Sequence, residues 1–310
     1  MFLLISILSF YTTIPFTIVL NPFANFYKTL TDYVGKIDVS IYCNEINIFL
    51  IILYYLLFFG ALIIFDLKLN KIGKIYSGTL IFIGLILLTP FENLYEQSVS
   101  FLNIGQGDSC LIRLCDKTIL IDTGGLSYKD VATSCTIPYL RKRKIYTIDY
   151  VIATHQDNDH IGAYESLKEN FRIKKLVTNR AFFPLKINDI VFENLNTEFY
   201  DNENDSSLVI KSKIKGKTFL WMGDASTIVE EDLLKKYPDL SADILKVGHH
   251  GSKTSTCEEF IQKLKPKEAV ISVGKGNYYG HPNVEVLNIL KKYDVVIRRT
   301  DLEGTVNYFL

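Results

Sequence analysis

The sequence has no net charge, because 34 basic side chains balance 34 acidic ones. A chain without a basic excess has no overall electrostatic attraction for nucleic acid, so such binding would have to rest on a local patch. A local basic run, Arg-Lys-Arg-Lys, does occur at residues 141–144. It fits a solvated helix end or loop, and it also fits a patch that steers phosphate groups.

Cysteine is scarce and follows no pattern. The five cysteines include no Cys-x-x-Cys pair, and an odd number cannot all pair with one another. We therefore expect free thiols rather than a disulfide framework. Cys257 follows His250 by seven residues, and we expect it to pack in the fold or lie at the surface rather than bind a metal.

Charged residues are absent from three long apolar segments, residues 1–20, 46–65 and 75–91. A helix needs about 20 apolar residues to cross a bilayer, so the pattern predicts about three transmembrane helices. The first segment has neither a basic start nor a small-residue cleavage site, and Pro15 interrupts it. These features favour a membrane span over a signal peptide.

The short loop after the second apolar segment is rich in lysine, with Lys68, Lys71 and Lys74. The positive-inside rule places this loop in the cytoplasm, so the chain after the third span should be extracytoplasmic. We therefore expect a multi-pass protein of the cell membrane that contacts lipid through residues 1–95. Residues 21–45 fit either an amphipathic helix on the membrane or a plain loop.

The composition changes after residue 96 to short β-type runs separated by turn residues. Runs of this kind predict strands at 99–104, 109–114, 117–121, 150–153, 207–214, 217–222, 244–247 and 269–273. Helical periodicity predicts helices at 136–143, 162–170, 227–237, 258–264 and 284–293. Strands followed by alternating strands and helices indicate an α/β layered domain over residues 96–310.

All five histidines lie in three short motifs at the ends of these predicted strands. The motifs are Thr-His-Gln-Asp-Asn-Asp-His at 154–160, Lys-Val-Gly-His-His-Gly-Ser at 246–252 and Tyr-Gly-His-Pro at 279–282. Asp224 also ends a predicted strand. Imidazole and carboxylate are the ligands of hydrolytic two-metal sites, so the clustering predicts a metal centre.

The first motif holds enough ligands for two cations. In an extended segment His155, Asp157 and Asp159 would point to one side, because residues two apart face the same way. His160, at the turn into a helix, would approach from another direction. Asp224 could then bridge two neighbouring metals that hold a hydroxide between them.

These motifs resemble those of the metallo-β-lactamase fold superfamily, whose first metal motif reads His-x-His-x-Asp-His. Asp157 stands here in place of its second histidine. That variant occurs together with Gly-Gln-Gly-Asp at 105–108, Asp-Thr-Gly at 122–124, His-His-Gly-Ser-Lys at 249–253 and Gly-His-Pro at 280–282. The combination resembles the C-terminal domain of the ComEC family, which forms DNA-uptake channels in bacterial competence. The three apolar segments resemble the end of that family's membrane region.

The resemblance implies an αββα sandwich with two divalent metal ions, manganese or zinc. It implies metal ligation by His155, Asp157, Asp159, His160, Asp224 and His250. It further implies that His249 faces the substrate or transfers a proton, because two adjacent histidines of an extended segment cannot face one site. Asp122 resembles a residue that braces the metal loop. His281 fits either a catalytic group or a helix cap, and Ser252 and Lys253 could donate to a phosphate oxygen.

Two departures from the family pattern are notable. No histidine lies between His160 and His249, where many relatives have a ligand before the bridging aspartate, and Asn204, Asp205 and Ser206 stand there instead. An oxygen-rich ligand set favours manganese, although zinc also fits. The chain is also shorter than the family's channels, so we expect a fragment of a longer frame or a partner of a separately encoded channel.

The motifs and the resemblance together predict a membrane-tethered, metal-dependent phosphodiesterase or nuclease that acts on DNA during competence uptake. Its expected partners are single-stranded DNA, membrane lipid and other competence-channel components. Two alternatives stay open. One is a metallo-hydrolase of another ester, of the phosphocholine esterase or lactonase type. The other is a non-catalytic module that guides DNA through a transporter.

Overall fold

The computed structural model describes residues 97–310 and a few isolated positions before them. Apart from these isolated positions, the predicted membrane spans lie outside the described residues, as does the predicted domain boundary near residue 95. Among the residues that are described, no helix combines the length and the apolar character that a bilayer crossing needs.

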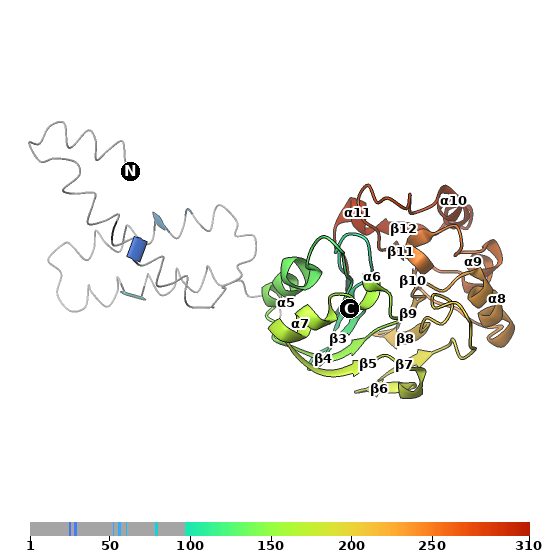
Figure 1. Cartoon of the computed structure of the whole chain (residues 1–310), viewed down its shortest axis with the longest axis horizontal. Coiled ribbons are helices and arrows are strands. Elements are labelled where there is room, and N and C mark those ends of the chain that lie inside the picture. The colour runs from blue at the N-terminus through green and yellow to red at the C-terminus, as the bar shows by residue number, and fades with distance from the viewer. Residues whose placement is uncertain are drawn as a thin grey trace, which may run out of the picture. The chain divides into compact units, whose positions relative to one another are not determined.

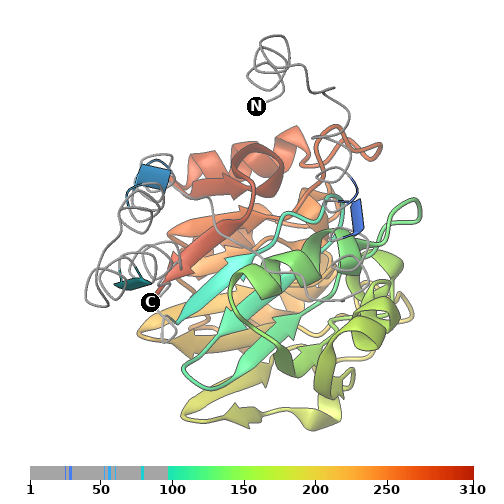
Figure 2. The same ribbon diagram turned by 90° about the vertical axis from the view of Figure 1, so that its left-hand side faces the viewer.

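Residues 97–310 form two mixed β-sheets. The first sheet has the strand order β13-β1-β2-β3-β4-β5. Its strands are β1 (Ser98–Phe101), β2 (Cys110–Arg113), β3 (Thr118–Ile121), β4 (Thr147–Ile152), β5 (Arg172–Val177) and β13 (Val306–Phe309). Figure 2 shows β13 beside β1, so that strands from the two ends of the described domain are neighbours.

The second sheet has the order β12-β11-β10-β9-β8-β7-β6. Its strands are β6 (Leu185–Ile187), β7 (Ile190–Asn194), β8 (Ile210–Ile214), β9 (Lys217–Trp221), β10 (Ile244–Lys246), β11 (Glu268–Ile271) and β12 (Val296–Arg299). The strands from β9 to β12 run parallel, and the strands from β6 to β9 run antiparallel.

Helices cover the outer face of each sheet, as Figure 1 shows from left to right across the domain. The first sheet carries α5 (Ile137–Lys142) and α7 (Tyr164–Asn170), and the short helix α6 (Asn158–Ile161) lies in the loop after β4. The second carries α8 (Thr227–Lys236), α9 (Glu258–Leu264) and α10 (Val284–Lys292), and α11 (Thr300–Glu303) precedes β13. This is the αββα sandwich that the family resemblance implies.

Side-chain alternation in the strands builds this layering. In β3, Ile119 and Ile121 join the core between the sheets, whereas Leu120 faces the helices. In β9, Phe219 and Trp221 face the same central core. Strands covered on both faces bury every residue, and for that reason they appear in the sequence as continuous apolar runs.

The predicted turn between β8 and β9 is confirmed. Ile214 pairs with Lys217 across Lys215 and Gly216, and both turn residues have positive φ values of 47° and 84°. A two-residue hairpin loop requires this conformation because its twist matches that of the strands. The predicted helix at 162–170 differs in detail, because α6 and α7 form two short helices that together begin at Asn158.

Candidate metal centre

The predicted ligands meet at one edge of the sandwich, where parallel strands of both sheets end. Asp122 follows β3, and His155 follows β4 by three residues. In the second sheet Trp221 of β9 pairs with Lys246 of β10, so the turns that carry Asp224 and the His249–His250 pair leave from the same edge. Carboxyl ends of parallel strands gather loops in this way.

Asp224 lies at the middle of the cluster and is almost fully buried. Its Oδ1 lies 3.0 Å from His160 Nε2 and 3.7 Å from His250 Nε2. Its Oδ2 lies 3.9 Å from His155 Nε2 and 3.7 Å from His249 Nε2. Each oxygen of one carboxylate therefore faces a different pair of imidazoles.

The first group of donors consists of Asp159, His160, His250 and Asp224, whose ligand atoms all lie within 4.8 Å of one another. Asp159 Oδ2 is 3.1 Å from His250 Nε2. Donors around a tetrahedral ion at about 2.1 Å are roughly 3.4 Å apart, so these spacings suit one divalent cation.

The second group surrounds the other oxygen of Asp224. His155 Nε2 lies 3.6 Å from Asp157 Oδ2, and His249 approaches from the opposite loop. This group is more open, because the side chain of Asp157 is 45% exposed and that of His249 is 28% exposed. Each group thus offers two imidazoles and one carboxylate of its own, and both groups share Asp224.

Buried polar atoms without partners support the presence of a cation. His155 Nε2, His160 Nε2 and Asp224 Oδ1 are buried and have no hydrogen-bond partner among the described residues. His160 Nε2 and Asp224 Oδ1 are 3.0 Å apart, yet they do not meet with hydrogen-bond geometry. Leaving such atoms unsatisfied is costly, and one divalent cation in each donor group would satisfy them. The residues present therefore fit divalent metal.

Two of these imidazoles are oriented by hydrogen bonds at Nδ1, on the side of the ring away from Asp224. His250 Nδ1 donates to the Ser272 carbonyl over 2.9 Å, which leaves Nε2 as the free donor atom for a metal. His160 Nδ1 lies 3.0 Å from Asp122 Oδ2. Asp122 also accepts bonds from the backbone N–H and the hydroxyl of Thr154, so it ties the β3 and β4 loops together. Outer partners of this kind fix the tautomer and orientation of a metal-binding histidine.

The histidine pair is not extended, contrary to expectation. His249 and His250 have φ values of 46° and 52°, in the left-handed region that non-glycine residues rarely adopt. The backbone N–H of His249 donates to the Gly223 carbonyl in the turn before Asp224. Because of this sharp turn, both rings approach Asp224, and the predicted division of roles between them stays a prediction. Asp159 likewise lies on α6 rather than in an extended segment, and His160 lies on the same helix.

The other predicted residues lie around this centre. His281 has its ring 5.8 Å from that of His249, at the rim. Ser252 is buried and accepts a bond from Thr254, whereas Lys253 is exposed. The basic run at 141–144 begins in the last turn of α5 and precedes the start of β4, whose six residues span about 20 Å. It therefore lies near the far edge of the sheet, and a phosphate contact beside the centre does not fit this placement.

Sequence reasoning missed Asp108 and Lys246. Lys246 Nζ lies 2.6 Å from Asp108 Oδ2, and both side chains are buried. Asp108 Oδ1 is also 3.4 Å from His250 Nδ1. Asp108, Asp122 and His160 are close enough together to hold an ion, but the Lys246 ammonium already supplies a cation there. We assign this cluster to the support of the histidines. A lysine in the apolar run Ile-Leu-Lys-Val was the available signal, because a buried lysine needs an acidic partner.

Charge and burial shift the ionisation of these groups in opposite directions. Burial alone would raise the pKa of Asp224, but the neighbouring His160 and His250 hold it well below its usual value. Burial would also lower the pKa of His250, yet Asp224 and Asp108 raise it to about 10. For His155 burial prevails, and with repulsion from His160 it lowers the pKa. A carboxylate that stays ionised in a buried site is prepared to bind cations.

Comparisons with known proteins agree with this geometry. Residues 102–186 match the family model of the metallo-beta-lactamase superfamily. ComE operon protein 3 of Bacillus subtilis (strain 168) is 36% identical over 255 residues, which cover 69% of this chain and 33% of that protein. Competence protein ComA of Neisseria gonorrhoeae is 29% identical over 69% of this chain and 32% of its own length. Recombination protein 2 of Haemophilus influenzae is 30% identical over 73% of this chain and 31% of its own length.

The chain therefore spans about a third of the length of the curated relatives that it matches. The matched family model begins at Leu102, directly after β1, and includes the motif from His155 to His160. The sandwich, the His/Asp cluster and these relatives lead to one conclusion: the chain contains a metallo-β-lactamase superfamily domain that is homologous to these competence proteins.

Proposed function

We propose that the chain is a metal-dependent phosphodiesterase that hydrolyses DNA, tethered to the membrane with its hydrolase domain outside the cytoplasm. The observation that carries the catalytic part is Asp224, whose two oxygens face two sets of donors. These residues would hold two divalent cations, which would supply an activated water and positive charge against the phosphoryl and leaving oxygens. This chemistry suits a phosphodiester.

The chain's own residues would divide the remaining work. Asp122 and the Ser272 carbonyl orient His160 and His250. His281 lies at the rim, with its ring 5.8 Å from that of His249, so it is placed to accept a proton at the reacting oxygens. Burial and the nearby His249 lower the pKa of His281, and this favours its neutral form.

DNA is the proposed substrate because the relatives are a ComE operon protein, a competence protein and a recombination protein. The placement of residues 141–144 removes one expected phosphate contact. Exposed cations closer to the centre are Lys253 and Lys275, and Arg180 lines a cleft that reaches His155. Binding should therefore weaken as salt rises, but by the modest amount expected of a few contacts.

The test uses the full chain with labelled single-stranded DNA, in the presence of manganese, zinc or a chelator. We expect cleavage with metal and none with the chelator. The Asp224→Asn variant should lose both metals by elemental analysis, whereas Asp159→Asn should lose one. Asp239→Asn, which changes an exposed carboxylate after α8, is the matched control and should retain both.

Other outcomes separate the alternatives. If the metal-loaded chain leaves DNA intact but hydrolyses a lactone or a phosphocholine ester, it is a hydrolase of that other class. If it binds DNA and cleaves nothing with either metal, the guiding-module function replaces the enzyme. Protease added to intact, wall-free cells should remove the hydrolase domain, and complete protection would contradict its extracytoplasmic location.

A further inference from the structure

A cleft of about 530 Å³ opens directly beside the candidate metal centre. Asp159, whose Oδ2 belongs to the first donor group, forms part of its wall. The other walls come from residues 274–279 after β11 and from residues 125–128 after β3. A molecule in this cleft would therefore touch the metal centre without covering it.

Three exposed tyrosines line this cleft. Tyr128 is 80% exposed, Tyr278 is 99% exposed and Tyr279 is 68% exposed. Large aromatic rings usually gain free energy by burial, so a group of open rings at one cleft indicates a binding surface. Tyr279 also stacks on His281, with ring centres 5.8 Å apart and an interplanar angle of 25°. Through this stack the aromatic surface continues to the rim of the metal centre.

Amide side chains, not the tyrosine rings, hold the loop that carries Tyr278 and Tyr279. Asn277 Nδ2 donates to the Gly274 and His281 carbonyls, and Asn277 Oδ1 accepts from the His281 N–H. Gln106 Oε1 accepts from the Gly274 N–H. The loop thus has its own support, and the rings stay open for a ligand. Lys275 is exposed beside them and supplies one positive charge.

We propose that this cleft is a base-binding subsite for single-stranded DNA, in which nucleobases stack on Tyr278 and Tyr279 while the adjoining phosphate reaches the metal centre. The inference rests on the proposed function and specifies its substrate. Every base has a π-face, so stacking on aromatic rings binds strands of any sequence. Paired bases in a duplex are already stacked, so open rings favour a single strand.

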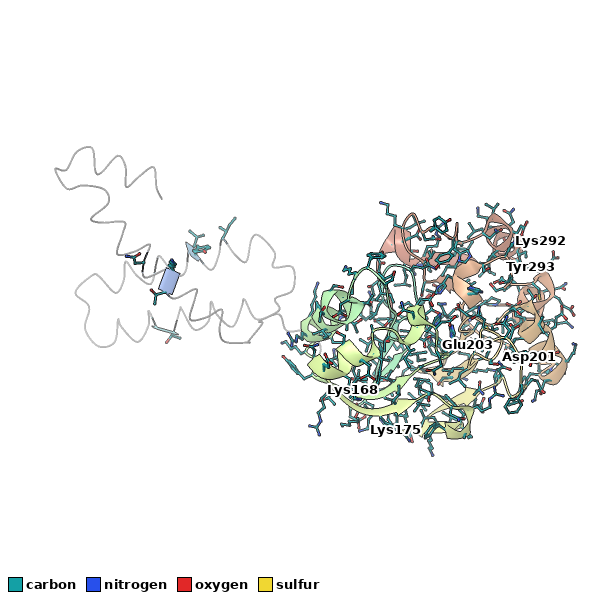
Figure 3. The ribbon with its side chains drawn as sticks, in the orientation of Figure 1. Lys168, Lys175, Asp201, Glu203, Lys292 and Tyr293 are labelled. Atoms are coloured by element: carbon teal, nitrogen blue, oxygen red, sulfur yellow. The ribbon has the colours of Figure 1, made fainter. Side chains whose placement is uncertain are left out.

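A second cleft, of about 420 Å³, reaches the centre from the side of His155. The Arg180 guanidinium lies 4.4 Å from the centre of the Phe199 ring there, and Phe199 is 88% exposed. Glu203, labelled in Figure 3, is the acidic residue in its lining. Aromatic surfaces beside both donor groups suit a strand that continues past the cleaved bond in both directions, rather than a mononucleotide ester.

The test measures binding by the full chain with a chelator present, so that no strand is cleaved. The probes are a fluorescein-labelled strand of ten thymidylates and an abasic strand of the same length, which carries the same phosphates without bases. The variant is Tyr278→Ser with Tyr279→Ser. The control is Tyr146→Ser, because Tyr146 is 69% exposed but lies before the start of β4, at the opposite end from His155.

We expect the double variant to bind the thymidylate strand more weakly, by about 5- to 150-fold for each base that no longer stacks on a tyrosine ring. Its binding of the abasic strand should not change, and Tyr146→Ser should match the unaltered chain with both probes. Unchanged thymidylate binding by the double variant would overturn the subsite. Equal weakening with both probes would also overturn it, because the rings would then not read bases.

Hydrolysis of bis(p-nitrophenyl) phosphate by the unaltered chain with manganese tests the proposed function separately, because this ester has no nucleobase. Absence of hydrolysis together with tyrosine-dependent strand binding would contradict the proposed phosphodiesterase activity and support the base-binding subsite. Hydrolysis with no effect of the tyrosines would remove the subsite and keep the phosphodiesterase.

Discussion

Replacing Lys246 by methionine should destabilise the domain more than any ordinary surface change. Methionine has nearly the shape of the lysine stem, so the substitution removes the charge while keeping most of the packing. Asp108 would then be buried without the ammonium that now lies 2.6 Å away. Removing one partner of a buried ion pair costs about 3–5 kcal/mol, because the other charge is left uncompensated.

This loss of free energy of unfolding corresponds to a fall in the melting temperature, Tm. For a domain the size of residues 97–310, each kcal/mol lowers Tm by about 2–4 °C, so we expect a fall of roughly 6–20 °C. The measurement is thermal unfolding of the full chain followed by circular dichroism, with manganese present so that the histidines stay neutral. Lys246→Met with Asp108→Asn should recover most of the loss, because no charge then remains unpaired.

A loss smaller than about 1 kcal/mol in the single variant would refute the reasoning, since that is the size of an exposed pair. It would mean that His250 or a metal, rather than Lys246, compensates Asp108. Lys267→Met is the matched control. It breaks the pair with Asp243 at 2.8 Å, but the lysine side chain is 79% exposed, so its loss should change Tm very little.

Four further predictions concern the metal centre. Asp122→Asn should weaken metal binding about 10- to 100-fold while the fold persists, because the carboxylate that orients His160 is lost. Calorimetric titration with manganese measures the affinity. An unchanged affinity would show that Asp122 does not orient the ligand. Gly107→Ala should lower both Tm and metal content, because a Cβ there would lie 2.5 Å from the Asp159 carbonyl oxygen on α6. Gly216→Ala is the control: the space around it is open, so the substitution should cost only about 1 kcal/mol of backbone strain. Removing metal with a chelator should lower Tm. The free energy of unfolding should fall by about 4 kcal/mol if the free metal concentration was about a thousand times its Kd. An unchanged Tm would show that the folded chain holds no metal. His249→Ala should keep both metals and lose turnover if His249 faces the substrate as the resemblance implies, and elemental analysis showing one metal instead of two would make it a ligand.

The parts of the fold that sequence predicted best are those with strong local signals. The hairpin at Lys215–Gly216 has a glycine in its turn and apolar runs on both sides, so its position is fixed locally. By contrast, β5 was missed because half of its residues are charged and only Val177 is buried. It is the edge strand of the first sheet, and only its pairing with β4 makes it a strand. Pairing of this kind has no signature in the strand's own sequence.

In the candidate site, too, features with a local sequence signal could be predicted and features that depend on distant contacts could not. The clustering of the candidate ligands could be predicted because histidine and aspartate stand in short motifs, but the directions of their side chains could not. The left-handed backbone of His249 and His250 depends on a bond from the His249 N–H to Gly223, which is in another loop of the same edge. Alternation along an extended chain was therefore the wrong rule for these two residues. Asp108 was missed as a partner of the histidines for a similar reason, since its contacts with His250 and Lys246 cross from one sheet to the other.

The position of His249 also changes the argument about which metal the centre prefers. From the sequence, the position near His155 had one imidazole and two carboxylates, which favoured manganese over zinc. The structure brings His249 to 3.7 Å from the same oxygen of Asp224 that His155 faces. If His249 binds metal, both positions have two imidazoles, one carboxylate of their own and the shared Asp224, and donor type no longer separates them. If it faces the substrate, the position near His155 stays oxygen-rich and should exchange zinc for manganese more readily than its neighbour. The preference for manganese at that one position therefore depends on the role of a single side chain.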